Sequence, residues 1–170
     1  MPQAQADLPH STESGIDEVT DAVLTASRLL VAVSARSIAD VDETITLSQF
    51  RLLVILHSRG TQKLTALAAI LGVNPSTATR SVDRLVTSGK VDRQINPRSR
   101  RETQISLTVA GTWLVSEVTS RRRHEITRIV AAMPPAGRHG LVDALTAFAD
   151  AGGEPPASIS PYDAGDTDWA

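Results

Sequence analysis

The chain has 170 residues, of which 41% are hydrophobic and 21% charged, and its formal net charge is -2. This length suits one modest hydrophobic core, and the absence of cysteine excludes disulfides, thiolate zinc sites and thiol-based redox switches. No uninterrupted apolar run of about 18 residues occurs, and the first residues do not have the pattern of a signal peptide. We therefore expect a cytoplasmic protein with no membrane partner.

The N-terminal part is predicted to be an arm followed by one long helix. Residues 1–15 are polar, with few apolar anchors, and are expected to be disordered. Within residues 16–45, apolar side chains recur at helical spacing from Ile16 to Val33, and the helix is expected to end near Ala39.

Residues 46–107, called the central domain below, begin with three predicted helices. Thr46 followed by Gln49 fits a capping box for a helix from Leu47 to His57, and a second helix over 62–71 stops at Gly72. For the third helix, Asn74 is a good N-cap, Pro75 suits the first helical position, and Gly89 can end it. The last two helices have the size and punctuation of a helix-turn-helix.

The polar side of the third helix carries short hydroxyls and guanidinium groups. Short hydroxyls let a helix approach DNA closely, and Arg can bond the edge of guanine through two hydrogen bonds. The candidates for base contact are Thr77, Thr79 and Arg80, and those for phosphate contact are Ser76 and Arg84. Alternatively, the hydroxyls only cap a surface helix, and Asp83 either orients a neighbouring Arg or lies on a solvated face.

Two stretches after this helix, Lys90–Ile95 and Glu102–Leu107, alternate with period two and predict a hairpin. The linker between them carries Arg98, Arg100 and Arg101 and no carboxylate, which indicates a wing that contacts phosphates or a minor groove. A solvated loop is the alternative, and Arg98 fits it better. Residues 60–107 carry eight basic and three acidic side chains, a net charge of +5, so the remainder carries -7.

The C-terminal part, residues 108–152, is predicted to form two helices. Thr108 can cap a helix to about Ala132, and a second helix runs from about Pro135 to Ala151; residues 153–170 are expected to be a disordered acidic tail. For Arg121, Arg122 and Arg123 we expect salt bridges to acids of the first helix, such as Asp17 or Asp21, with a pocket for an anionic effector as the alternative. The apolar faces of the terminal helices exceed what the central domain covers, which predicts a homodimer and a near-palindromic DNA site.

The run from Thr46 to Gly111 resembles the MarR family of bacterial winged helix-turn-helix regulators. The resemblance rests on Leu-Gly-Val-x-Pro-Ser-Thr-x-Thr-Arg-x-Val-Asp-Arg-Leu at Leu71–Leu85, then Gly89, a basic wing and Leu-Thr-x-x-Gly at Leu107–Gly111. It implies a mostly α fold with a small two-stranded β wing and with N- and C-terminal dimerisation helices. It also implies a transcription regulator, most often a repressor, that releases double-stranded DNA when a small anionic aromatic ligand binds between the dimer helices and the central domain. One position departs, since Ser99 stands where the family usually has an Asp that braces the wing Arg, here Arg101.

Other function classes fit the sequence less well. A winged-helix module that binds protein or RNA explains the hairpin but not the Ser/Thr/Arg first turn of the third helix. The sequence lacks a Gly-x-Ser-x-Gly elbow and a phosphate loop, so we do not expect an enzyme. His57 and His124 stand alone without metal-ligand spacing, and neither a metal nor another cofactor is expected.

Overall fold

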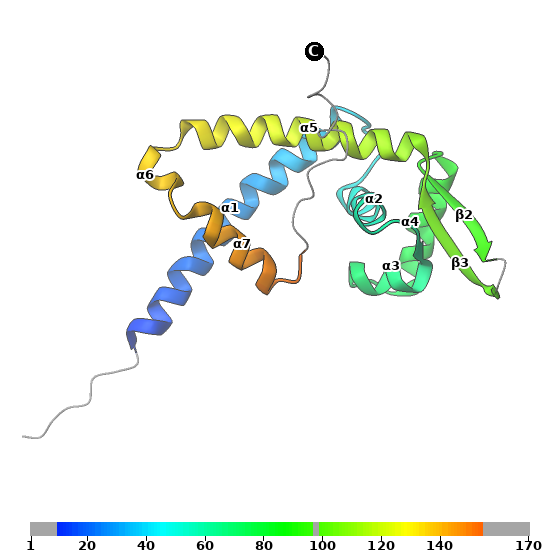
Figure 1. Cartoon of the computed structure of the whole chain (residues 1–170), viewed down its shortest axis with the longest axis horizontal. Helices are drawn as coiled ribbons and strands as arrows, with labels where there is room; N and C mark the ends of the chain where they lie inside the picture. Colours follow the sequence, from blue (N-terminus) through cyan, green and yellow to red (C-terminus); the bar gives the residue numbers. More distant parts are fainter. Residues whose placement is uncertain (1–9, 97–98, 155–170) are drawn as a thin grey trace, which may run out of the picture.

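The computed structural model describes residues 10–96 and 99–154, which form a mostly helical fold with a small antiparallel sheet (Figure 1). In chain order the elements are α1 (His10–Ala39), α2 (Leu47–Arg59), β1 (Gln62–Lys63), α3 (Leu64–Leu71), α4 (Pro75–Thr87), β2 (Val91–Asn96), β3 (Ser99–Leu107), α5 (Val109–Ala132), α6 (Pro135–Arg138) and α7 (Leu141–Ala151). The helices α2, α3 and α4 gather with the sheet at one end, α5 runs from there to α6, and the C-terminal end of α1 meets α5 while its N-terminal part diverges from it (Figure 1).

Helix α2 lies at the centre of the core, as its scarcity of polar positions predicts. Phe50, Leu52, Leu53 and Leu56 are buried in one cluster with residues of α4, β3 and α5. The helix starts at the predicted capping box: the Gln49 N–H donates to the Thr46 hydroxyl at 3.3 Å, and the Thr46 N–H donates to Gln49 Oε1 at 2.8 Å.

The sheet has three strands in the order β1-β3-β2, so the expected two-stranded wing gains a third strand. Gln62 pairs with Ile105 and Lys63 with Gln104. A strand of two residues is too short to show an alternation of apolar and polar side chains in the sequence. Only its pairing with β3 identifies β1 as a strand. The hairpin is also longer than expected, because a register shift after Ile95 lets Asn96 pair with Ser99.

The terminal helices differ from expectation at two places. Helix α1 begins at His10, so part of the expected arm is helical, while residues 1–9 lie outside the described residues. The single helix expected over Pro135–Ala151 is divided into α6 and α7, because Gly140 between them has φ 75°. Most of the expected acidic tail, residues 155–170, lies outside the described residues as well.

Segment Gly15–Ala39 of α1 is, by length and composition alone, apolar enough to cross a membrane. It is not an uninterrupted apolar run, because Asp17, Glu18, Asp21, Arg28 and Arg36 lie within it. A core helix of a water-soluble protein passes the same test. The last turns of α1 do pack inside the protein, where Val33 and Ile38 are buried.

Candidate nucleic-acid interface

Helix α4 is anchored in the central domain by three small or medium apolar side chains. Ala78, Val82 and Leu85 are each fully buried, whereas Val86, which the sequence pattern assigns to the same face, is 38% exposed. Because these anchors recur at helical spacing, the opposite face points outward. Of the predicted site residues on that face, Ser76, Arg80 and Arg84 are exposed, and Thr77 and Thr79 are half-buried.

The hydroxyl groups at the start of α4 form local hydrogen bonds. Asn74 Oδ1 accepts from the Thr77 N–H and from the Ser76 hydroxyl, both at 2.8 Å, and the Thr79 hydroxyl donates to the Pro75 carbonyl at 2.8 Å. The capping alternative therefore describes part of what these residues do. The remaining donors on this face belong mainly to the guanidinium groups.

No hydrogen bond or ion pair with another described side chain occupies the guanidinium group of Arg80 or Arg84. Asp83, between them, contacts neither Arg80 nor Arg84: its side chain is 53% exposed, and its Oδ1 lies 2.7 Å from Nη2 of Arg93 on β2. This ion pair connects α4 to the wing, and Arg93 neutralises the only acidic side chain of α4. The exposed face of α4 therefore keeps the positive charges of Arg80 and Arg84. The sequence carries no signal for Arg93, because its partner lies across the turn between α4 and β2.

The wing extends from the end of α4 (Figure 1). Arg98 lies outside the described residues. Arg100 and Arg101 belong to β3 rather than to a loop, and their side chains also lie outside the described part of the chain. The backbone of Arg100 and Arg101 is therefore held in a strand, which corrects the expected six-residue linker.

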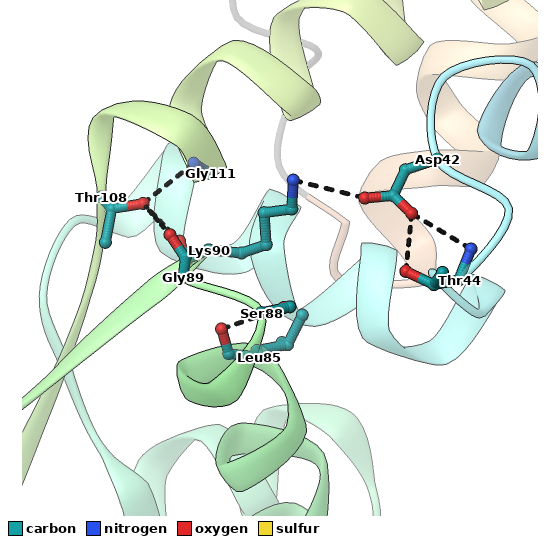
Figure 2. Close-up of polar contacts among 8 residues, drawn as sticks. All are labelled: Asp42, Thr44, Leu85, Ser88, Gly89, Lys90, Thr108 and Gly111. Carbon is teal, nitrogen blue, oxygen red and sulfur yellow. Dashed lines mark hydrogen bonds and ion pairs between the residues drawn. The ribbon is translucent and has the colours of Figure 1, made fainter.

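The segment that follows α4 contacts the start of α5 through backbone groups and the Thr108 hydroxyl (Figure 2). The Thr108 hydroxyl donates to the Gly89 carbonyl at 2.7 Å and accepts from the Gly111 N–H at 3.0 Å, which caps α5 as predicted. The Thr108 N–H donates to the Lys90 carbonyl at 3.1 Å. A Cβ on Gly111 would lie 2.0 Å from that carbonyl oxygen, so the approach of the two backbones requires glycine.

An open cleft of about 470 Å³ lies between the C-terminal half of α1 and the middle of α5. It is lined by Arg36, Ser37, Asp40, Ser120, Arg121, His124 and Glu125. The salt bridges here differ from those expected: Arg121 pairs with Glu117 of its own helix at 3.0 Å, and the pair that joins the helices is Arg36 with Glu125 at 3.7 Å. Arg122 is half-buried, and this burial lowers the pKa of its guanidinium group.

Comparison with known proteins assigns the chain to a family. The MarR family model matches residues 45–103. The crystal structure of RV1404 from Mycobacterium tuberculosis is 59% identical, with a TM-score of 0.79, over 84% of this chain and 97% of that chain. The chain belongs to the MarR family. Its fold is that of the MarR transcriptional regulators, whose members are not enzymes.

More distant members share the fold of this MarR-family protein. BpsR of Bordetella bronchiseptica, whose DNA binding is regulated by 6-hydroxynicotinic acid, is 23% identical over 78% of this chain and 99% of its own, with a TM-score of 0.61. A MepR mutant of Staphylococcus aureus bound to an oligodeoxyribonucleotide is 18% identical over 78% and 96% of the two chains, with a TM-score of 0.60. A search of curated proteins gave no match.

Proposed function

We propose that this MarR-family chain is a homodimeric, sequence-specific DNA-binding transcriptional repressor whose operator affinity is lowered by a small anionic aromatic ligand. The observation that carries the proposal is the outward face of α4, where Arg80 and Arg84 are exposed on a helix anchored by Ala78, Val82 and Leu85. The MepR mutant of the same fold bound to an oligodeoxyribonucleotide supports it.

In this proposal α4 enters the major groove of double-stranded DNA. Arg80 bonds a guanine edge, Thr77 and Thr79 face base edges, and Arg84 bonds a phosphate. Since the Ser76 hydroxyl donates to Asn74, contact with a phosphate requires Ser76 to rotate its proton away from that bond. The wing arginines Arg98, Arg100 and Arg101 contact phosphates or an adjacent minor groove.

The homodimer is proposed from apolar side chains that a single copy leaves exposed. In α1 they include Ile16 and Val19, each 62% exposed, and in α7 they are Val142, Leu145 and Phe148, exposed by 75%, 54% and 59%. Helix α7 has no buried residue within one copy. A two-fold axis through these helices would place the two copies of α4 about 34–36 Å apart, one turn of DNA, on a near-palindromic site.

For the ligand we propose the cleft between α1 and α5. Arg36 and Arg121 supply positive charge there, each already paired with a carboxylate that an anionic ligand would replace. The regulation of BpsR by 6-hydroxynicotinic acid, an anionic aromatic compound, supports this class of ligand. Because His124 carries the one aromatic ring among the described residues that line the cleft, charge and hydrogen bonds would contribute more than stacking to holding the ligand.

The test is binding to the DNA adjacent to the gene, followed over a series of salt concentrations. Affinity should fall steeply with salt, as counterions are released from phosphates. Arg80→Ala should cost about 1 to 3 kcal/mol and relax the base preference, whereas Arg101→Ala should weaken all sequences to a similar extent.

Arg51→Ala is the matched control, since Arg51 is an exposed arginine of α2 outside the proposed interface. If Arg80→Ala and Arg101→Ala both bind like the Arg51→Ala control, the proposed interface is wrong. A flat salt dependence would favour the module that binds a protein partner.

A further inference from the structure

The side chain of Lys90 reaches from the end of α4 to the turn that follows α1 (Figure 2). Its Nζ lies 3.3 Å from Oδ2 of Asp42, and the two side chains are only 17% and 21% exposed. The other carboxylate oxygen of Asp42 accepts from the Thr44 N–H at 3.1 Å and from the Thr44 hydroxyl at 2.6 Å. The carboxylate is therefore held in place from its own turn and presents one oxygen to Lys90.

The backbone of Lys90 is held from two further directions. Its N–H donates to the Leu85 carbonyl of α4 at 2.9 Å. Its carbonyl accepts from the N–H and the hydroxyl of Thr108, both at 3.1 Å, at the start of α5. One residue thus joins α4 to α5 through its backbone and to the end of α1 through its ammonium group.

Neither of the other ion pairs between elements described above connects α4 to the turn after α1. Asp83–Arg93 joins α4 to β2 inside the central domain, and Arg36–Glu125 joins α1 to α5. A rotation of α4 and the wing as one body, relative to the two long helices, would separate Lys90 from Asp42. A largely buried ion pair contributes little net stability compared with apolar packing, but it favours a single geometry because each partner is costly to leave unpaired.

From this convergence we infer that Lys90, held by Asp42, is a positioning residue for DNA recognition. The pair fixes the orientation of α4 on α1 and α5 and thereby sets the separation of the two recognition helices in the dimer. This inference rests on the proposed function, since it concerns a dimer that reads two half-sites.

The absence of cysteine makes a direct measurement possible. Thr87→Cys places one spin label on the exposed last residue of α4, and double electron-electron resonance then gives the distance between the two copies in the absence of DNA. With Lys90 present, one narrow distribution is expected. Lys90→Met keeps the aliphatic stem and removes the charge, and should give a distribution about twofold broader because further orientations become populated.

Two variants complete this measurement. Lys90→Arg keeps a cation and should restore most of the narrow distribution, and Arg51→Met removes an exposed charge elsewhere and should leave it unchanged. A Lys90→Met distribution that coincides with that of the labelled parent would overturn the inference. If Lys90→Met does not fold, as judged by circular dichroism, Asp42→Asn is measured against the same criterion. A chain that stays monomeric at micromolar concentration has no second α4 to position, and would overturn the inference too.

The second measurement uses duplexes in which the separation of two half-sites is varied one base pair at a time. The parent should prefer one separation, and Lys90→Met should lose about tenfold in affinity there and less at neighbouring separations. An equal loss at every separation would indicate general destabilisation and would count against the inference. If the parent binds no duplex, the proposed DNA-binding function fails and the inferred role in DNA recognition fails with it, while the distance measurement still decides whether Lys90 fixes the orientation of α4.

Discussion

The close approach of α5 to the end of α4 can be tested by adding one methyl group at Gly111. In Gly111→Ala the new Cβ would lie 2.0 Å from the Lys90 carbonyl oxygen and 3.1 Å from Cδ2 of Leu107. Since real Cβ atoms essentially never lie under 3.0 Å from a neighbour, the first turn of α5 must move by about 1 Å from Lys90. That movement stretches the two hydrogen bonds from Thr108 to the Lys90 carbonyl, both 3.1 Å long.

The cost follows from these contacts. Overpacking costs about 1–3 kcal/mol, and each of the two weakened hydrogen bonds costs about 1 kcal/mol. The higher helix propensity of alanine offsets about 1 kcal/mol of this cost in unfolding free energy. The net loss of unfolding free energy should be about 2–4 kcal/mol, which corresponds to a fall in Tm of roughly 4–16 °C for a chain of this size.

The measurement is urea and thermal unfolding at one fixed protein concentration, because dimerisation makes Tm depend on concentration. Gly15→Ala is the matched control: Gly15 lies in α1, and an added Cβ there meets nothing within 4 Å. This control should leave stability unchanged or raise it by about 0.5–1 kcal/mol. If Gly111→Ala unfolds at the same urea concentration as the parent, the tight contact with Lys90 does not exist in solution.

Three further substitutions test the core, the α4 cap and the α1–α2 turn by the same unfolding measurements. Leu85→Ala removes a fully buried anchor of α4 and should cost about 2–5 kcal/mol, and a cost below 1 kcal/mol would mean that α4 is not packed as described. Asn74→Ala removes the acceptor for the Thr77 N–H and should cost about 1 kcal/mol, whereas an unchanged midpoint would argue against this cap. The Thr44 hydroxyl, helped by Lys90 and opposed by burial, holds the pKa of Asp42 below its ordinary value of 3.8, so the ionised form stabilises the fold above that pH. Asp42→Asn should therefore lower stability by a constant amount at neutral pH, with a difference that shrinks as the pH falls below about 4, and a difference that grows in acid would contradict the assignment.

Features that depend on a few neighbouring residues could be predicted from the sequence. The caps at Thr46, Asn74 and Thr108 each satisfy an N–H three residues further on, so the residue types and their spacing are sufficient to locate them. The amphipathic period of α4 likewise predicts the anchors Ala78, Val82 and Leu85, although it also assigns the exposed Val86 to that face. Because they also depend on residue types at fixed local spacings, the helix-turn-helix and its family resemblance could be identified from the sequence alone.

Only the tertiary structure decided which distant groups meet. The sequence assigns no partner to Lys90 and suggests only a neighbouring Arg for Asp83, since Asp42 lies 48 positions before Lys90 and Arg93 lies beyond the turn after α4. The sequence shows Gly111 as part of a motif. It does not show that the Lys90 carbonyl lies close enough to Gly111 to make glycine necessary. Local propensity acts along the chain, whereas ion pairs, close backbone contacts and short strands such as β1 depend on how helices and strands are placed in space, and that placement results from burial of the shared core.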